Sequence, residues 1–364
     1  MKALTIGGAM VDTIAVIADE RIERMIMRNA DTSFLLLEEG RKIEADDIST
    51  HCGGGAVNAA VALARLGHEV SALIKLGQDA RGDSILSRLG AEGVSTEFAS
   101  RDPRAPTGAS VMVSAHERNA AIFTFRGANT LLGPADLDAK AFAADLVYVS
   151  SLSNQSADRF PQIIEQAKAN GALVATNPGI RQLSARQGAF REVMAKIDIL
   201  ALNRSEAGAL VPWLVALNGE GGRPLDRLPG EDLPDLALRG FAAGGFELSL
   251  RGFMAAIGTL GPRWIVVTDG RDGAYVGSPA GIMHCPALPV EPVGTAGGGD
   301  AFNATFAAFI AESAGLEAAM LAAAVNAASV IGHLDTQTGL LPRAELQQRL
   351  AQVQGTVKLR QWSH

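Results

Sequence analysis

Cysteine and aromatic residues are scarce in this sequence. Its 364 residues include 2 cysteines, and 5% of them are aromatic. Cys52 and Cys285 show neither the spacing of a metal site nor a disulfide framework, so we expect two buried, inert thiols in a reducing compartment. The low aromatic content disfavours a pocket that stacks a nucleobase, although it does not exclude one.

Dense basic runs and long apolar runs are also missing. The 32 Lys and Arg against 39 Asp and Glu give a formal net charge of −7, with no basic run that would bind a nucleic acid. Polar and charged residues interrupt the most apolar region, residues 301–331, before it reaches the ~20 residues of a membrane span. The first residues lack the apolar segment and cleavage site of a signal peptide. We therefore expect a cytoplasmic protein without nucleic-acid or membrane partners.

Two common nucleotide-binding motifs are absent as well. The sequence contains neither a Gly-x-Gly-x-x-Gly turn nor a Gly-x-x-x-x-Gly-Lys-Ser/Thr phosphate loop. A dinucleotide-dependent oxidoreductase is an alternative that rests only on the rhythm of strands and helices, and the missing first motif argues against it.

What the sequence does contain is a regular alternation of short apolar runs and helical stretches. Helices are predicted over residues 57–66, 83–89 and 160–169, after Ser205, and as two buried alanine-rich helices within residues 301–331. The apolar runs between them are LTIGG, VSALIKLG, DLVYVSS, ALVATNP, IDILALN and WIVVTDG. This order predicts an α/β fold with a mostly parallel sheet covered by helices on both faces. Ligands of such sheets bind at the carboxyl ends of the strands.

Three segments depart from this rhythm. Residues 14–49 and 106–127 contain β-like runs that we expect to pair into a small side sheet. Residues 212–252 are rich in Gly, Pro and acids, which predicts an exposed insertion. Neither an internal repeat nor a linker is evident, so we expect one domain over residues 1–364.

GGGAVNAAVALARLG, residues 53–67, places glycines and Asn58 at the start of a predicted helix. A ligand can lie against backbone N–H groups at such a turn, and Asn58 offers both a donor and an acceptor. Glycine-rich turns also serve close helix packing, so this motif alone assigns no function.

Two further turns follow predicted strands. In NRSE, Asn203 and Glu206 suit a phosphate or a magnesium-bound water, but a helix capping box explains them equally and is the simpler interpretation. TDGRDG, residues 268–273, predicts a hairpin turn. Whether that turn also contacts a ligand depends on its neighbours.

GTAGGGD, residues 294–300, is the most specific motif. If a helix begins at Asp300 or Ala301, the preceding glycine N–H groups and the helix dipole converge on one anion. A carboxylate beside a bound phosphate would be repelled, so we interpret Asp300 as a proton acceptor for an attacking hydroxyl. The alternative is a helix N-cap after a flexible loop.

Together these motifs resemble the ribokinase-like carbohydrate kinases, also called the PfkB family. Residues 53–67 are similar to its N-terminal signature, and GTAGGGDAF is similar to its C-terminal signature Asp-Thr-Thr-Gly-Ala-Gly-Asp. The segments KLGQDARG, RGAN, NRSE and VVTDGRDGAYV lie in matching order between them. The resemblance covers nearly the whole chain and implies a ribokinase-like fold, in which residues 14–49 and 106–127 form a β lid that excludes water.

The resemblance implies ATP-dependent transfer of the γ-phosphate to a hydroxyl of a sugar, or alternatively of a nucleoside, with Mg²⁺. The implied residues are Asp300 as general base with Gly297, Gly298 and Gly299 as anion hole; Met10, Asp12, Gly54, Gly55 and Asn58 for the substrate; Asn203, Thr268, Gly270, Gly273 and Asn326 for ATP; and Glu206 for magnesium through water. Dimers that meet through the lid occur among relatives, so a homodimer is one expected assembly.

Two positions depart from the family signature. Gly294 replaces its first Asp and Ala296 its second Thr. In relatives activated by potassium, that Asp belongs to a monovalent-cation site, so we expect activation by potassium to be weak or absent here. The same departures motivate a second hypothesis, a catalytically silent sensor that binds a sugar or nucleotide, although the retained Asp300 argues against it.

Overall fold

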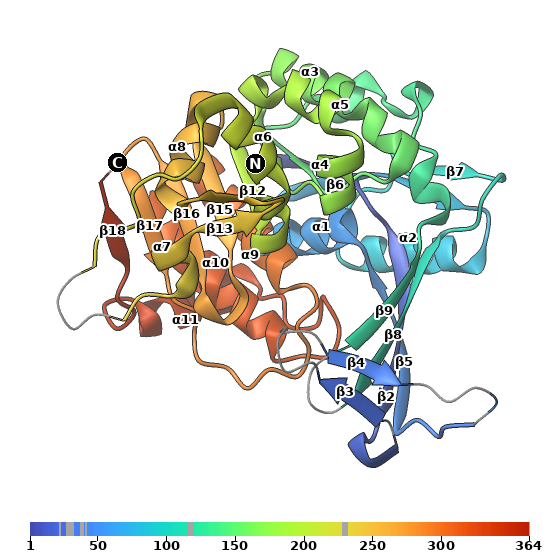
Figure 1. Ribbon diagram of the computed structural model, residues 1–364. Helices are drawn as coiled ribbons and strands as arrows, with labels where there is room; N and C mark the ends of the chain where they lie inside the picture. Colours follow the sequence, from blue (N-terminus) through green and yellow to red (C-terminus); the bar gives the residue numbers. More distant parts are fainter. Residues whose placement is uncertain are drawn as a thin grey trace.

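The computed structural model describes residues 1–21, 23–26, 33–36, 40, 42–115, 120–227 and 232–363. Its centre is a 10-stranded sheet in the order β18-β17-β16-β15-β12-β11-β10-β1-β6-β7 (Figure 1). The strands from β15 to β7 in this order are parallel, and β16, β17 and β18 continue the sheet in antiparallel pairing. Their bounds are β1 Lys2–Gly7, β6 Glu69–Gly77, β7 Ser100–Asp102, β10 Leu146–Val149, β11 Leu173–Thr176, β12 Ile199–Asn203, β15 Trp264–Thr268, β16 Ala274–Ser278, β17 Gly281–Cys285 and β18 Arg360–Trp362.

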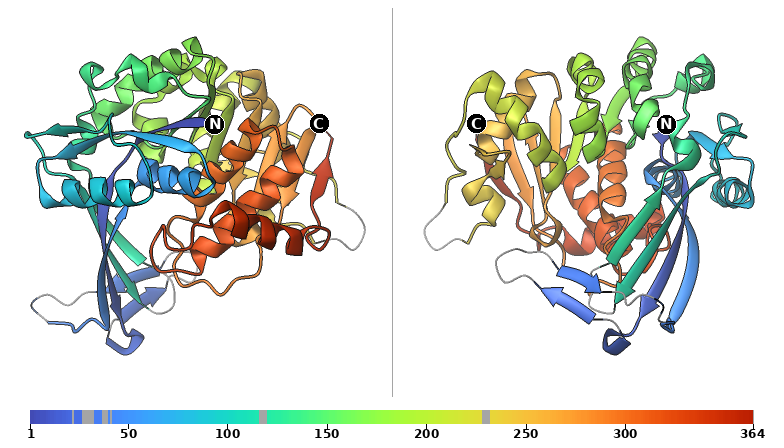
Figure 2. Two further views of the ribbon diagram at one scale, coloured as in Figure 1. Left: turned by 180° about the vertical axis from the view of Figure 1, so that it is seen from behind. Right: turned by 45° about the vertical axis from the view of Figure 1, so that its right-hand side comes forward.

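Helices cover both faces of this sheet, as Figures 1 and 2 show. One face is packed by α1 Gly55–Arg65, α2 Ala80–Ala91, α9 Gly298–Ala311, α10 Leu316–Ile331 and α11 Arg343–Val353. The other is packed by α3 Phe160–Ala169, α4 Ile180–Ala185, α5 Gln187–Glu192, α6 Arg204–Asn218, α7 Asp235–Arg239 and α8 Leu250–Thr259. Successive side chains of a strand point to opposite faces, so Ala3 lies in the first core while Leu4 and Ile6 lie in the second. The predicted helices are present, with boundaries shifted by up to three residues.

A separate 4-stranded sheet has the order β5-β2-β8-β9 and projects from the body (Figure 2). Its strands are β2 Met10–Ile17, β5 Asp47–Gly53, β8 Gly108–Ala115 and β9 Ala120–Phe125, which come from the two segments expected to form the lid. β2 begins at Met10, before the expected start at residue 14. A two-stranded pair, β3 Glu23–Ile26 and β4 Ser33–Leu36, lies nearby. The predicted fold class, a mostly parallel sheet with flanking helices and a small lid sheet, is confirmed.

The lid sheet has two unlike faces. Asp12 and Ser110 are paired in register and their side chains meet on one face. On the opposite face Val111 pairs with Phe123, and Phe125 follows two residues along β9. Phe123 and Phe125 are 58% and 52% exposed. The lid sheet thus has an exposed apolar face, and the homodimer through the lid stays a prediction.

The expected insertion differs from its prediction in two respects. α6 continues through Pro212 to Asn218, so the extra segment begins at Gly219 rather than at residue 212. A proline removes one helical hydrogen bond, but buried Val211 and Leu214 anchor the helix on either side of it. The segment then forms α7 and the hairpin of β13 Phe241–Ala243 and β14 Phe246–Leu248. Its apolar side chains join the second core, so it is not simply an exposed loop.

Among the described residues, no helix is both long and apolar enough to cross a lipid bilayer.

Candidate active site

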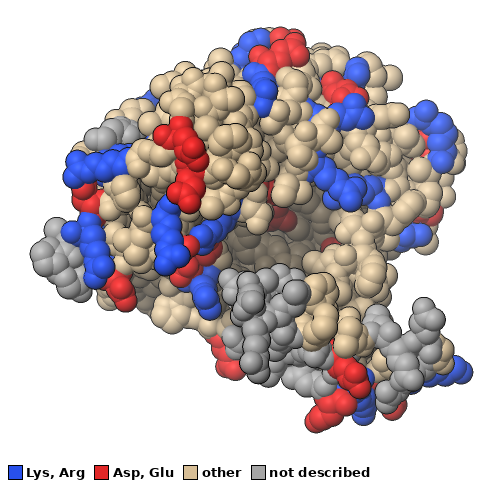
Figure 3. Space-filling view, in the orientation of Figure 1, with Lys and Arg blue, Asp and Glu red and all other residues tan. Residues whose placement is uncertain are grey.

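The predicted site residues gather where the parallel strands end. Figure 3 shows a hollow between the α/β body and the lid sheet, with acidic atoms at its back. The N-terminal turns of α1 and α9, two helices packed against each other, both begin at this edge of the sheet. This is the edge at which ligands bind in parallel α/β sheets.

A hydrogen bond joins the two glycine-rich motifs. Asn58 Nδ2 donates to Asp300 Oδ2 at 2.8 Å, across 242 residues of chain. Asn58 is 3% exposed, and its Oδ1 accepts from Thr336 Oγ1 at 2.9 Å and from Gln337 Nε2 at 3.1 Å. Two donors on Oδ1 fix the amide so that its nitrogen faces Asp300. Asn58 therefore holds the carboxylate of Asp300 in one orientation.

Asp12 approaches the same place from the lid. Its Oδ1 accepts a hydrogen bond from the hydroxyl of Ser110. Burial raises the pKa of Asp12, while Ser110 and the nearby His51 act in the opposite direction. Burial also raises the pKa of Asp300, opposed by the Asn58 donor and reinforced by the charge of Asp12. The two carboxylates thus interact electrostatically across the hollow.

The three glycines before Asp300 have different reasons to be glycine. Gly297 has φ +82°, and a Cβ there would lie 2.7 Å from Thr336 Cβ. A Cβ on Gly298 would lie 3.0 Å from Ile331, whereas a Cβ on Gly299 would meet nothing within 4 Å. α9 begins at Gly298, two residues before the earliest start that we expected, so Gly298, Gly299 and Asp300 form its first turn. Their N–H groups lack helical partners and are available to an anion.

The glycines at the other turn are packed by protein atoms. Gly54 has φ +97°, and a Cβ there would lie 2.5 Å from the Gly8 oxygen. A Cβ on Gly55 would lie 2.8 Å from Ser150 Cβ and 3.6 Å from Asp300 Oδ1. Met10 is half-buried at the start of β2, where it pairs with Gly108. The predicted substrate residues therefore surround Asp300 and Asp12.

Asn203 and Glu206 form the capping box that was the simpler interpretation. Glu206 N donates to Asn203 Oδ1 at 2.8 Å, and Asn203 N donates to Glu206 Oε2 at 2.9 Å. Burial raises the pKa of Glu206, and the negative charge of Asp300 adds to the rise. Glu206 thus caps α6 and also interacts electrostatically with Asp300.

TDGRDG forms the predicted hairpin turn between β15 and β16. Thr268 pairs in parallel with Asn203 of the neighbouring strand, so the two predicted ATP residues lie side by side. Asp269 N donates to Gly273 O at 2.8 Å, and a Cβ on Gly273 would lie 2.1 Å from the Cys285 oxygen. A Cβ on Gly270 would meet nothing within 4 Å. Gly273 is therefore required by the turn, while Gly270 leaves the space above it open.

The structure does not support the ATP-site role that the resemblance implied for Asn326. Its side chain is 0% exposed. Asn326 Nδ2 donates to Thr305 Oγ1 at 2.8 Å, and its Oδ1 accepts from Leu341 N at 2.9 Å. These bonds occupy the amide between α9, α10 and the loop after α10. Asn326 is thus a buried structural residue.

Thr336 and Gln337 were missed by sequence reasoning. Both belong to the loop that follows α10, and both orient Asn58. Polar residues directly after a buried apolar helix were the available signal, but nothing in the spacing ties them to residue 58.

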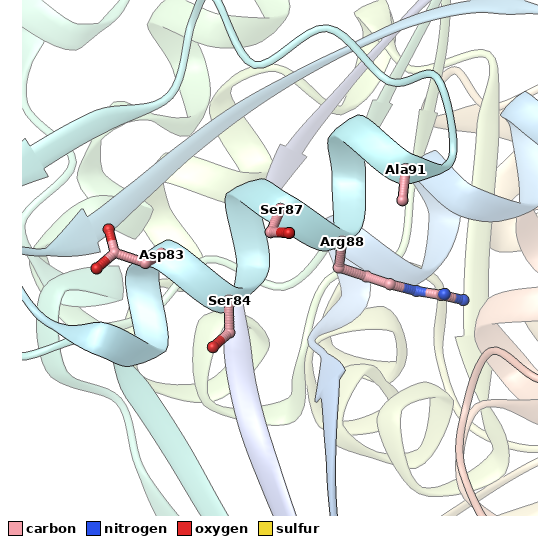
Figure 4. A pocket seen from close by; sticks show the side chains of 5 residues that line it. All are labelled: Asp83, Ser84, Ser87, Arg88 and Ala91. Carbon is pink, nitrogen blue, oxygen red and sulfur yellow. The ribbon is translucent and has the colours of Figure 1, made fainter.

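A shallow groove elsewhere on the surface is not part of this site. Figure 4 shows it along α2, lined by Asp83, Ser84, Ser87, Arg88 and Ala91. Asp83 pairs with Arg101, and Arg88 pairs with Glu92 at 2.8 Å. Its charges are therefore already engaged within the protein.

The family model described as pfkB family carbohydrate kinase matches residues 22–213 and 248–344. This chain belongs to that family. It is accordingly a carbohydrate kinase, as predicted. The match omits residues 214–247, which contain α7, β13 and part of β14, so the extra segment is an addition to the family pattern.

Relatives within the pfkB family are similar along most of their length. The deoxyribokinase of Salmonella typhi is 28% identical over 331 residues, which cover 89% of this chain and 94% of that protein. The ribokinase of Bacillus subtilis is 27% identical over 317 residues, with coverage of 86% and 92%. The ATP-dependent ribose-1-phosphate kinase of Halopiger xanaduensis is 28% identical over 257 residues, with coverage of 70% and 72%.

Solved structures share the fold. The ribokinase of Thermotoga maritima superposes with a TM-score of 0.72 at 19% identity, covering 96% of this chain and 99% of that one. The Arabidopsis thaliana ribokinase, solved with ribose and ATP, gives a TM-score of 0.70 at 21% identity, covering 96% and 98%.

Proposed function

We propose that this pfkB-family enzyme transfers the γ-phosphate of ATP to a hydroxyl of a sugar, with Asp300 as general base. The observation that carries the proposal is the hydrogen bond from Asn58 to Asp300, because it fixes a carboxylate beside the unpaired N–H groups of α9. A base and an anion-binding turn side by side are what phosphoryl transfer to an alcohol requires.

In the proposed reaction the acceptor hydroxyl lies between Asp300 and the γ-phosphate. Asp300 accepts the proton while the hydroxyl oxygen forms its bond to phosphorus, and the bond to ADP breaks with its electron pair on ADP. The N–H groups of Gly298 and Gly299 stabilise the charge on the transferring group. Asp12 and Asn58 orient the acceptor, and the lid sheet excludes water that would otherwise hydrolyse ATP.

We expect ATP to bind at the carboxyl ends of β12 and β15, which are neighbours in the sheet. Asn203 and Thr268 lie side by side there, and the open space above Gly270 gives the nucleotide room to approach the backbone. The Arabidopsis relative was solved with ATP, which supports ATP as the nucleotide.

Magnesium fits the charges of the site. Burial and the charge of Asp300 raise the pKa of Glu206, and a cation held by Glu206 would relieve that repulsion. The described residues include no cluster of three His, Cys, Asp or Glu that could hold a metal alone. Magnesium often keeps waters and substrate phosphates as ligands, so Glu206 would hold it through water. When bound, it supplies charge neutralisation for the phosphates.

The acceptor is a pentose or a related small sugar. The relatives are named for ribose, deoxyribose and ribose 1-phosphate, which supports this class but leaves the charge of the acceptor open. A nucleoside acceptor is the alternative, and the low aromatic content favours it less.

The test is ATP consumption with a panel of sugars and nucleosides, using wild type and Asp300→Asn. We expect Asp300→Asn to lower turnover by about 10²–10⁴-fold while ATP affinity by calorimetry is unchanged. Because burial raises the pKa of Asp300, the ionised carboxylate destabilises the fold above that pKa, and its neutral replacement should be at least as stable at pH 7.

Asp145→Asn is the matched control. Asp145 lies just before the amino end of β10, remote from the site, where it accepts from Lys2 N at 2.7 Å. Its turnover should equal that of wild type. Near-normal turnover of Asp300→Asn would refute the base, and binding of ATP and sugar without transfer would favour the silent sensor.

A further inference from the structure

Arg126 is a half-buried cation that has no carboxylate partner among the described residues. It follows β9 at the base of the lid, and its Nη1 donates to Ser153 Oγ at 3.2 Å. Ser153 is neutral and leaves most of the guanidinium donors without a protein acceptor. Burying a cation without a counter-charge is costly, so the position calls for an anion that the protein does not supply.

The position of Arg126 is fixed against the acceptor side of the site. Asn129, three residues later, receives a hydrogen bond from Ala9 N at 2.9 Å and donates to Ala9 O at 2.8 Å. A Cβ on Gly108 would lie 3.1 Å from the Arg126 oxygen, and Gly108 pairs with Met10. Arg126 is thus held next to the start of β2, the strand that carries Asp12.

A second cation, Arg181 of α4, is exposed to solvent, and its charge acts on Arg126. Burial lowers the pKa of Arg126, and the positive charge of Arg181 lowers it further. Leu152 N donates to Gln182 Oε1 at 3.1 Å, so α4 packs on the turn that also contacts Arg126 through Ser153. Figure 3 shows basic side chains over the region of α4 at the rim of the hollow.

The turn after β10, residues 150–153, runs from the neighbourhood of Asp300 to Arg126. Its first residue, Ser150, lies against Gly55 at the point where Gly55 faces Asp300 Oδ1. Its last residue, Ser153, contacts Arg126. A small sugar whose hydroxyl reaches Asp300 can therefore extend along this turn toward the arginines.

Two other arginines on this side of the sheet do have carboxylate partners. Arg186, just after α4, pairs with Asp158 at 2.9 Å, and Arg204 pairs with Asp235 at 2.8 Å. No ion pair is recorded within the described residues for Arg126 or Arg181.

We propose that Arg126 and Arg181 bind an anionic group of the acceptor, a carboxylate or a phosphate, while Asp300 receives the proton of its hydroxyl. The preferred acceptors are then sugar acids or sugar phosphates rather than neutral sugars. This inference rests on the proposed kinase function and names its substrate class.

The test measures both binding and turnover. Thermal shift and ATP consumption are recorded with neutral sugars (D-ribose, 2-deoxy-D-ribose, D-fructose), sugar phosphates (ribose 1-phosphate, D-fructose 1-phosphate) and sugar acids (D-gluconate, 2-keto-3-deoxy-D-gluconate). We expect one anionic class to bind and react at least about tenfold better than its neutral counterparts, since hydrogen bonds to charged groups are the strong ones. The class that responds distinguishes phosphate from carboxylate.

Arg126→Gln and Arg181→Gln should each raise the KM for the preferred anionic acceptor by roughly 10–100-fold. KM for ATP should not change, and Arg126→Lys should recover part of the loss because it keeps the charge without the fork. Arg186→Gln, which breaks a pair with Asp158, is the matched control and should leave KM for both substrates unchanged.

Failure of this inference is distinguishable from failure of the kinase function. The anion site would be overturned if neutral and anionic sugars were phosphorylated at equal rates and Arg126→Gln had no effect. The kinase function would then remain. An anionic sugar that binds to wild type but not to Arg126→Gln, without turnover, would support the anion site while the kinase function fails. No preference for anionic sugars in binding overturns the inference whatever the turnover.

Discussion

The two glycine-rich turns look alike in the sequence but differ in what surrounds them. Protein atoms crowd Gly53, Gly54 and Gly55, where an added Cβ would lie 2.2, 2.5 and 2.8 Å from Asp12, Gly8 and Ser150. In the second turn Gly297 and Gly298 are also close to protein atoms, but Gly299 faces open space. The first turn therefore packs between β1, the lid and α1. The second turn leaves backbone N–H groups accessible to a ligand. The two glycine runs thus differ in one position, Gly299, which protein atoms leave open.

The largest effects are expected when one glycine of each turn is substituted, which tests the difference between the turns. Gly54→Ala places a side chain at φ +97° against the Gly8 oxygen, and we expect a loss of about 3 kcal/mol or more in the free energy of unfolding, measured with urea. Gly299→Ala should leave that free energy unchanged or raise it by about 0.4–1 kcal/mol. Its turnover should nevertheless fall on the order of 10²-fold, because a methyl group would displace the phosphate from the N–H groups. Equal stability of the two variants would contradict the distinction.

Asn58→Asp tests the hydrogen bond that joins the two turns. The added carboxylate would stand where an amide now donates at 2.8 Å, and the repulsion would raise the pKa of Asp300 further. A general base must be deprotonated, so activity is present above its pKa and is lost as pH falls through it. We expect the acidic limb of the kcat profile to move to higher pH, with turnover at pH 7 reduced roughly 10–100-fold and partly restored at pH 9. Asn58→Ala, which adds no charge, is the control; an acidic limb that moves equally in both variants would assign the shift to loss of the donor.

Replacing potassium should have the smallest effect. A Cβ on Gly294 would lie 2.8 Å from the His333 oxygen and 2.9 Å from the Leu334 oxygen, so the front of the second turn has no room for the carboxylate of the family signature. We expect turnover to change less than about twofold when tetramethylammonium replaces potassium. The comparison is made at constant ionic strength to keep screening equal. A large loss of rate would show that a monovalent cation is needed after all.

The sequence predicted most of the fold because its signals are local. Alternating apolar runs and helices, the capping box of Asn203 and Glu206, and the turn after Thr268 each lie within a few residues, and each is present. The run of glycines before Asp300 looked like a loop, yet α9 begins within it at Gly298, where a Cβ would lie 3.0 Å from Ile331.

Features that depend on distant packing could not be predicted. Thr336 and Gln337 orient Asn58 from more than 270 residues away, and no spacing indicates that contact. The resemblance named Asn326 but could not give the direction of its side chain, which points into the interior. Arg126 was noted only as part of a matching segment, since the lack of a counter-charge is visible only when all neighbours are in place.

The bond between Asn58 and Asp300 also has a consequence during protein synthesis. At typical rates of synthesis, the 242 residues between them take roughly 10–50 s to make. During that time the growing chain carries Asp12 and the first glycine turn but not Asp300, the proposed base. In the proposed mechanism, phosphate transfer becomes possible only when α9 has been made and packs against α1. A nascent chain of fewer than 300 residues therefore lacks the proposed base, although most strands of the central sheet have already been made.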